Sequence, residues 1–152
     1  MIIESLKDLY NRDLHILKRE IELYKNEATL WKIENTIKNS GGNLCLHILG
    51  NLKTYIGNGL SQIGYVRQQD LEFSATLVAR EELYKQIEET IQIVNQGLNN
   101  ITDEQLIEHF PIVIWEKETE MAYTLIHLHS HLNYHLGQLN YHRRILDKIE
   151  AL

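Results

Sequence analysis

The 152-residue sequence predicts an all-α fold, a four-helix bundle, from three observations. Apolar residues recur at steps of three and four along several stretches, which is the period of an amphipathic helix. Polar and glycine-containing junctions separate these stretches and carry helix-start signals. Four expected helices of about 18 to 30 residues account for most of the chain. We therefore expect one domain, residues 1–152, without a linker or an internal repeat.

The first and third expected helices are amphipathic and have charged outer faces. The first spans Ile3 to about Asn26, and the third is centred on a stripe from Leu83 to Leu98. In both helices, glutamate, lysine and other charged residues lie opposite the apolar stripe. These two helices therefore indicate how the solvent-facing surface of this protein looks. Their apolar stripes consist of Ile3, Leu6, Tyr10, Leu14, Leu17, Ile21 and Tyr24, and of Leu83, Ile87, Ile91, Val94 and Leu98.

The second expected helix runs from Asn43 to about Leu60. It follows the run Asn39-Ser40-Gly41-Gly42, which indicates a loop and a helix start. Residues 61–78 have no clean period, and we expect them to be mostly loop.

The remaining connection and the last helix are predicted from short local signals. Residues 102–105, Thr-Asp-Glu-Gln, fit a capping box that opens a short helical turn. Residues 112–115 form a β-branched run that suits an extended connector or a hairpin arm. Thr119 is the expected N-cap of the last helix, which runs from Glu120 to about Ile149.

Composition excludes several classes of protein. The chain is 43% hydrophobic with a net charge of -6, which is typical of an ordinary globular domain and not of a disordered chain. One cysteine, Cys45, excludes a disulfide scaffold, and the N-terminus carries no secretory signal, so we expect a cytoplasmic location. A pI near 5.7 provides no general attraction for phosphate, so nucleic acid is not an expected partner.

The last helix carries a polar stripe that contains no charged residue. From Met121 to His142 there is no Asp, Glu, Lys or Arg, but nine His, Ser, Asn and Gln side chains make the segment unsuitable as a membrane span. With 100° per residue, several polar side chains fall within about 40° of His131. These are Thr124, His127, His135, Gln138 and His142.

The second helix has a matching stripe around His47. Its members are Asn43, Asn51, Thr54 and Asn58. Three interpretations of the two stripes remain open. They are solvent faces, a buried network of hydrogen-bonded polar groups without a metal, or a metal site. The charged outer faces of the first and third helices argue against the first interpretation, because an exposed helix face usually carries Glu and Lys.

Histidine spacing supports the metal interpretation. His131 and His135 are four residues apart, so both imidazoles leave one face of the helix. By spacing alone, His127 and His131 form an equally good pair. His47 is the only histidine on the second helix and is the candidate third ligand, from a second helix, as bundle metal sites require.

The other histidines and the cysteine are expected to lie outside this site. His129 is about 160° away from His131 on the helix, and His142 is two or more turns away. Cys45 is expected to be a small buried hydrophobic residue. His15 and His109 are expected on the surface. Trp31, Trp115 and residues 112–114 are candidates for an interface or a lid.

Three runs of the sequence resemble the DinB-like superfamily, also called DinB/YfiT-like. Residues 39–52 resemble its second helix, and residues 131–138 are similar to its HxxxHxGQ signature. The run Arg67-Gln68-Gln69-Asp70-Leu71-Glu72-Phe73 is similar to an Arg-x-x-Asp-x-Glu-Phe segment of one branch.

The resemblance implies a bundle of up-down-down-up order that holds a divalent metal ion through His47, His131 and His135. The Gly-Gln pair after His135 favours His135 over His127. The resemblance also implies a homodimer. Some members of the family resemble transferases that use a low-molecular-weight thiol to attack a small electrophile.

The expected site suits two chemistries, thiol-dependent S-transfer and hydrolysis. Three neutral imidazoles leave a divalent ion its full charge, and such an ion lowers the pKa of a bound water or thiol. Zn, Ni and Fe(II) all suit imidazole ligands. No HExxH glutamate is present, so a zincin-type general base is excluded. Candidate acid–base or orienting residues are Tyr134, Tyr55, His127 and Gln138. The alternative is a non-enzymatic dimeric bundle, a binding or stress-response module whose metal site is structural or vestigial.

Overall fold

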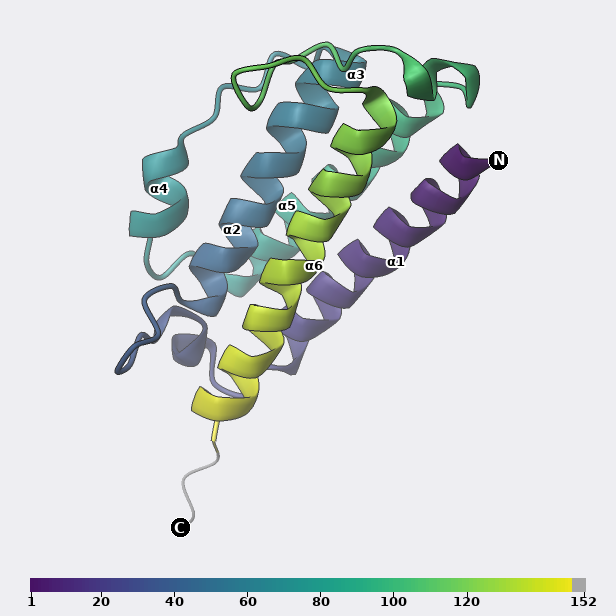
Figure 1. The fold of residues 1–152 in the computed structure, drawn as a ribbon. Coiled ribbons are helices and arrows are strands. Elements are labelled where there is room, and N and C mark those ends of the chain that lie inside the picture. Colours follow the sequence, from purple (N-terminus) through teal and green to yellow (C-terminus); the bar gives the residue numbers. More distant parts are fainter. Residues whose placement is uncertain (149–152) are drawn as a thin grey trace.

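The protein is all-α over residues 1–148, the part of the chain that the computed structural model describes. Within these residues no β-strand forms, and the long helices pack side by side as a bundle (Figure 1). The long helices are α1 (Ile2–Leu23), α2 (Gly41–Leu52), α5 (Arg80–Asn99) and α6 (Met121–Leu146). Two short α-helices, α3 (Gly59–Ser61) and α4 (Gln69–Ser74), lie between α2 and α5.

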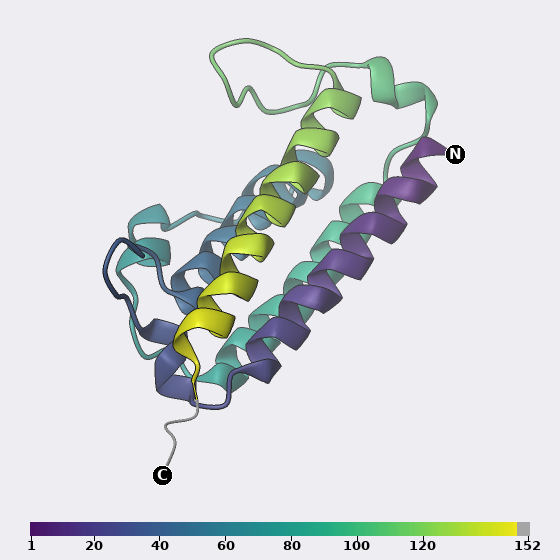
Figure 2. The same cartoon turned by 60° about the horizontal axis from the view of Figure 1, so that its bottom comes forward.

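The contacts between the long helices define their directions. The Tyr10 hydroxyl donates to the Leu125 carbonyl, and Asn140 donates to Glu20, so α1 and α6 run in the same direction. Gly41 lies beside His142, and His47 lies beside His131. Helices α2 and α6 therefore run in opposite directions. Figures 1 and 2 show α5 next to α1 and pointing the opposite way. Helices α2 and α6 therefore pack against each other in opposite directions, and their two polar stripes face each other.

The predicted apolar stripes of α1 and α5 form the core. All seven residues of the first stripe, six on α1 and Tyr24 directly after it, and all five of the α5 stripe are buried. They meet Leu44, Ile48 and Leu52 of α2 and Leu125, Leu128 and Leu132 of α6 in one continuous cluster. The first helix is three residues shorter than expected, because it ends at Leu23, and Tyr24 is already extended. A 3-10 helix, η1 (Glu27–Trp31), occupies the connection that follows, and Trp31 packs against the core.

The second helix begins two residues earlier than the sequence predicts and ends close to the expected position. It begins at Gly41, because Ser40 is extended and its hydroxyl accepts a hydrogen bond from the Asn43 amide at 3.1 Å. It continues through a π-helical segment, η2 (Lys53–Asn58), into α3. Gln62 adopts a left-handed conformation, with φ 49°, and ends the helix.

Residues 61–78 are mostly loop, as expected, but the sequence did not reveal one short helix within them. Helix α4 (Gln69–Ser74) forms there and lies against α2 (Figure 1). It has six residues, which is too short for a hydrophobic period to reveal it. The Asn43 side chain fixes it by donating to the carbonyls of Glu72 and Ala75.

The two predicted capping signals, at Thr102 and Thr119, both lie near a helix start, but neither forms the complete cap that the sequence predicts. The short turn is a 3-10 helix, η3 (Glu104–Ile107), and the Gln105 side chain accepts from the Thr102 amide, which is half of a capping box. Glu120, and not Thr119, is the N-cap of α6, because the Thr119 hydroxyl is engaged with the Thr124 hydroxyl at 2.8 Å. The last helix ends at Leu146; the expected end at Ile149 lies outside the described residues.

The connection between η3 and α6 is an irregular segment, as expected for residues 112–115. Isolated bridges join Trp115 to Lys117 and His109 to Glu120. Along the described chain, no helix combines the length and the apolarity that crossing a bilayer requires.

Candidate metal centre

Three histidines from two antiparallel helices meet between α2 and α6. His47 comes from α2 and is 8% exposed, while His131 and His135 come from consecutive turns of α6 and are half-buried. The Nε2 atom of His131 lies 3.2 Å from that of His47 and 3.1 Å from that of His135. One ring nitrogen from each residue lies within 4.8 Å of the others. The three side chains are therefore close enough to bind a single metal ion.

The spacing of the three nitrogens fits a small divalent ion. Nitrogen ligands lie about 2.0–2.1 Å from a tetrahedral Zn²⁺, which places them about 3.3–3.4 Å from each other. The distances from Nε2 of His131 to Nε2 of His135 and of His47, 3.1 and 3.2 Å, are close to this value, and ring nitrogens of all three residues lie within 4.8 Å of one another. The sequence spacing explains the pair on α6, since residues four apart lie on one face of a helix.

Two neighbouring side chains direct the lone pairs of the cluster toward its centre. The Nδ1 atom of His47 faces a carboxylate oxygen of Glu72 at 3.0 Å, and that of His135 faces the amide oxygen of Gln138 at 2.7 Å. Both partners accept hydrogen bonds, so we assign the proton of each ring to Nδ1. The Nε2 atoms of His47 and His135 are then unprotonated and face His131. Such a convergence of lone pairs is favourable when a cation occupies the centre.

Glu72 is the functional residue that the helix patterns missed. It lies on α4, is 5% exposed, and receives two hydrogen bonds from the Arg67 guanidinium, at 2.7 and 2.9 Å. Burial by itself raises the pKa of this carboxyl, but hydrogen bonds from His47 and Arg67 outweigh burial and hold the pKa below its usual value. The Arg-x-x-Asp-x-Glu-Phe run, residues 67–73, was the available sequence signal.

A glycine on α2 allows Glu72 to approach. A Cβ atom at Gly50 would overlap Oε1 and Cδ of Glu72.

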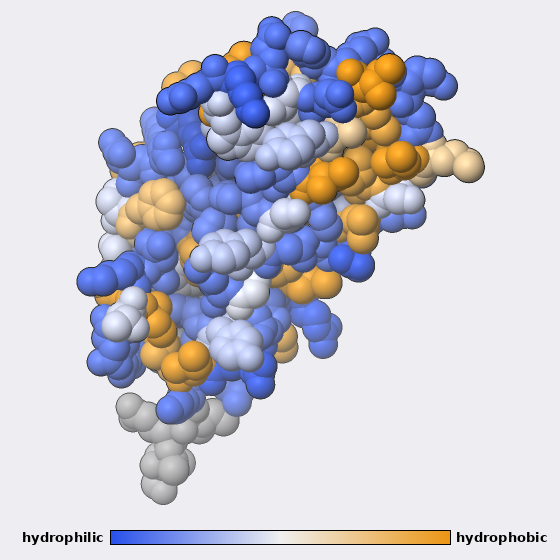
Figure 3. All heavy atoms as spheres, viewed as in Figure 1, coloured by the Kyte–Doolittle hydropathy of each residue, from blue (hydrophilic) through white to orange (hydrophobic). Residues whose placement is uncertain are grey.

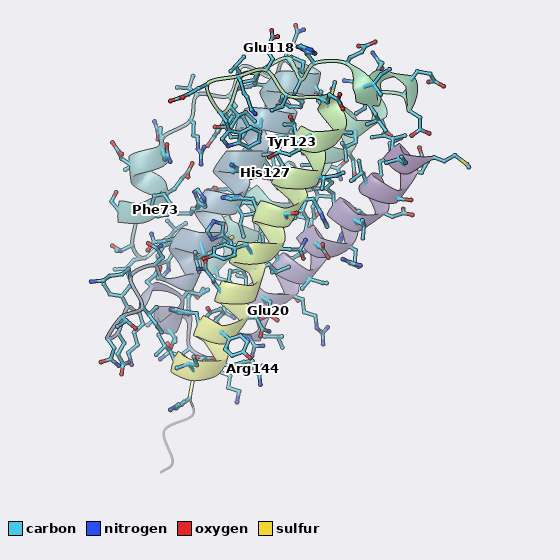
Figure 4. All side chains as sticks on the ribbon, viewed as in Figure 1. Glu20, Phe73, Glu118, Tyr123, His127 and Arg144 are labelled. Atoms are coloured by element: carbon cyan, nitrogen blue, oxygen red, sulfur yellow. The ribbon has the colours of Figure 1, made fainter. Side chains whose placement is uncertain are left out.

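On the outer side of the cluster, the Phe73 ring of α4 lies 4.8 Å from the His47 ring (Figure 4). Helix α4 thus supplies both a hydrogen-bond partner and an aromatic neighbour to His47.

The half-buried histidines of α6 favour the neutral form. Burial, with smaller contributions from the charges of His135 and His47, lowers the pKa of His131 to about 4. Burial also lowers the pKa of His135, against the opposing effect of its hydrogen bond to Gln138. A neutral imidazole is the form that binds a metal ion, so the protein environment keeps these residues ready to act as ligands.

The four candidate acid–base or orienting residues lie at different places around the cluster. Gln138 contacts His135 directly, and the exposed Tyr134 ring lies 5.2 Å from the His135 ring. His127 lies one turn before His131, with its ring 4.4 Å from Trp115. Tyr55 packs against the core cluster.

The remaining histidines are engaged elsewhere, as the sequence predicts. His129 bonds to the buried Asp13 carboxylate at 2.8 Å, on the side of α6 that faces α1. His142 is buried and bonds to the Tyr24 hydroxyl and the Lys32 carbonyl. His15 and His109 are exposed. Cys45 is fully buried, which raises the pKa of its thiol to about 12 and makes it a poor nucleophile.

The fold and the site define a helical bundle with a three-histidine cluster spaced for a metal ion. A family model described as "Protein of unknown function (DUF1572)" matches residues 2–150, and the chain belongs to this family. No curated protein matches the chain. The family description assigns neither an activity nor a metal, so these rest on the geometry of the site.

Proposed function

We propose that this protein is a DinB-like, up-down-down-up four-helix bundle, a single cytoplasmic domain over residues 1–152, that binds a divalent metal ion through His47, His131 and His135. We further propose that it is a metal-dependent enzyme, a thiol-dependent S-transferase or a hydrolase. The observation that carries the proposal is the convergence of three imidazoles, in which Nε2 of His131 lies 3.2 Å from Nε2 of His47 and 3.1 Å from Nε2 of His135. The helix directions and the Arg67–Phe73 run support the DinB-like assignment.

A divalent ion held by three neutral imidazoles supplies an electrophilic centre that lowers the pKa of a water or a thiol. The chain's own residues then have distinct roles. Glu72 and Gln138 orient two of the imidazoles through Nδ1, and Arg67 holds Glu72 in place. The candidates to orient a small electrophile or a low-molecular-weight thiol are Tyr134, whose ring lies 5.2 Å from the His135 ring, and His127, which lies one turn before His131 on the same helix.

The half-buried state of two ligands supports an open site over a closed structural one. His131 and His135 each retain some exposure, whereas a purely structural metal site is enclosed by protein ligands on all sides. Three protein ligands also leave at least one coordination position for another molecule. Zn, Ni and Fe(II) are all compatible with three imidazoles, and supply in the cell selects among them.

The proposal is tested with the Co(II)-substituted protein, whose visible absorption reports the ligands around the ion. We expect absorption bands in the wild type that azide or a small thiol shifts, because an open coordination position accepts them. His47→Ala should abolish the bands, and the exposed His15→Ala should leave them unchanged. Bands that neither azide nor thiol affects, together with no turnover of thiol or ester substrates, would favour the non-enzymatic module with a structural site.

A further inference from the structure

The loop that precedes α6 forms a cavity outside the metal cluster. Its volume is about 370 Å³, and it lies at the N-terminal end of α6. Figure 4 shows Glu118, Tyr123 and His127 in this order along that end of the helix, and Figure 3 shows less hydrophilic residues there, surrounded by hydrophilic ones. Nothing in the proposed function uses this cavity. It is lined by Trp115, Lys117, Glu118, Thr119, Glu120 and Tyr123.

The frame of the cavity is fixed by contacts at the base of the loop. An isolated antiparallel bridge joins His109 to Glu120 there. The Phe110 amide donates to the Thr119 carbonyl at 2.8 Å, and the Phe110 side chain is buried in the core. The Thr119 hydroxyl also bonds to the Thr124 hydroxyl of α6. A frame fixed in this way holds the walls in place before a ligand binds, which lowers the entropic cost of binding.

Two aromatic rings and two carboxylates make the cavity suitable for an organic cation. The Trp115 and Tyr123 rings are 5.9 Å apart and nearly perpendicular, at 83°, so they form two walls that meet at a corner. The face of an aromatic ring attracts a cation, and tryptophan does so most strongly. Glu118 and Glu120 add two negative charges against one positive charge from Lys117, so the lining is negative overall. An ammonium or guanidinium group, which carries a positive charge and N–H donors, matches these surroundings.

Trp115 connects the cavity to the metal cluster. Its ring lies 4.4 Å from the His127 ring, and His127 is one turn before the ligand His131. Tyr123 is two turns before His131, which is about 12 Å along the helix. A cation directly beside the metal ion would be repelled by it, but at this distance the repulsion is weak. A molecule that binds the metal and also occupies the cavity is therefore elongated, with its charge at the far end.

We propose that this cavity binds the ammonium or guanidinium end of a small elongated molecule whose other end, a thiol or an electrophilic group, reaches the metal ion. The inference rests on the proposed function for the contact with the metal, whereas the cation site itself does not need the metal. Neutral molecules of the same length lack the attraction of Glu118, Glu120 and the two rings. The cavity thus selects the cationic members among the thiols or electrophiles that fit the metal centre.

The first measurement tests the cation site in the metal-free protein. In Trp31→Phe, Trp115 is the only remaining tryptophan, so its fluorescence reports on the cavity. At constant ionic strength, we expect butylammonium and methylguanidinium to change this emission saturably and butanol to leave it unchanged. Glu118→Gln/Glu120→Gln should weaken both cations at least tenfold, and Lys117→Met should strengthen their binding. Glu104→Gln/Glu108→Gln is the matched control, because it removes the same charge from exposed residues that do not line the cavity.

The second measurement tests the link to the metal in the Co(II)-substituted protein. Aminohexanethiol and mercaptohexanol carry a thiol on chains of the same length and differ in the terminal group. We expect the amino thiol to shift the Co(II) bands with at least tenfold higher affinity. Glu118→Gln/Glu120→Gln should remove this advantage and leave the binding of mercaptohexanol unchanged. Cysteamine, whose chain is too short to reach the cavity, should bind equally to the wild type and to this variant. Circular dichroism checks that each variant remains helical.

Two outcomes would overturn the inference. If neither cation changes the Trp115 emission saturably, the cavity is not a cation site. If aminohexanethiol and mercaptohexanol bind the Co(II) protein equally well, the cavity does not serve the metal centre. Failure of the proposed function gives a different pattern, in which no Co(II) bands form or no thiol shifts them. That pattern removes the link to the metal, while the cation titration of the metal-free protein stays as predicted.

Discussion

Glu72 accepts a hydrogen bond from Nδ1 of His47 at 3.0 Å, although the two residues lie on different helices, α4 and α2. The carboxylate is buried and is held from its other side by Arg67. In metal sites, a carboxylate in this position fixes the orientation of the imidazole and strengthens it as a ligand. The metal affinity of this protein should therefore depend on a residue that does not itself contact the ion.

The first prediction follows from this contact. Glu72→Gln removes the negative charge but keeps a similar shape, and we expect the affinity for Zn²⁺ to fall about 10- to 100-fold. Competition titration against a chelator of known affinity measures the change. Asp70→Asn is the matched control, because Asp70 is an exposed acid on the same short helix. Equal affinities for wild type and Glu72→Gln would show that the carboxylate does not support the site.

The second prediction concerns the glycine beneath Glu72. In Gly50→Ala the new methyl group overlaps the Glu72 carboxyl group, which cannot move without breaking its bonds to His47 and Arg67. We expect lower metal affinity and a lower unfolding temperature. Gly137→Ala is the control, since a Cβ there meets nothing within 4 Å, and it should stabilise α6 by roughly 0.5–1 kcal/mol. Identical behaviour of the two variants in a thermal melt would contradict the prediction.

The third prediction separates folding from metal binding. Asp13 is buried on α1, and its carboxylate joins α1 to α6 by accepting from His129 and Asn133 at 2.8 Å each. Asp13→Ala removes the carboxylate partner of the His129 ring and one of the acceptors of the Asn133 side chain, and it should lower the free energy of unfolding by about 2 kcal/mol. Urea titration measures this loss, with the exposed Asp8→Ala as the control. Metal content should be unchanged, and a loss of metal would show that the two clusters depend on each other.

The fourth prediction is a pH dependence from His142. Its Nε2–H donates to the Lys32 carbonyl, so its Nδ1 accepts from the Tyr24 hydroxyl at 2.7 Å and must remain unprotonated. Burial, opposed by the bond to Lys32, lowers the pKa of His142 below 6.5. The unfolded chain then binds a proton at a pH where the folded chain does not. This contribution to stability is complete above about pH 6.5 and is lost as the pH falls through the lowered pKa.

The test compares thermal melts of the metal-free wild type and His142→Gln between about pH 7 and pH 5. Between these two pH values, the unfolding temperature of the wild type should fall further than that of the variant. Other histidines titrate in both proteins, so the difference between the two slopes isolates His142. Parallel slopes would contradict the assignment of a neutral ring.

The sequence predicted those parts of the fold and site that lie on long helices. Helical patterns of sixteen or more residues located α1, α5 and α6. The polar stripes indicated His47 and His131, and the resemblance to the HxxxHxGQ signature favoured His135 over His127 as the third member of the cluster. The parts it missed depend on tertiary contacts. Helix α4 has six residues and is fixed by Asn43, and the cap of α6 moved because Thr119 bonds to another hydroxyl. Such contacts leave no periodic signal in the sequence.

The most direct test of the account is the metal content of the untagged protein, measured by inductively coupled plasma mass spectrometry after reconstitution with zinc or nickel. We predict about one equivalent for the wild type and for His127→Ala, and a large loss for His47→Ala, His131→Ala and His135→Ala. Retention of metal by all three ligand variants, or its absence from the reconstituted wild type, would contradict the assignment of these histidines to a metal centre.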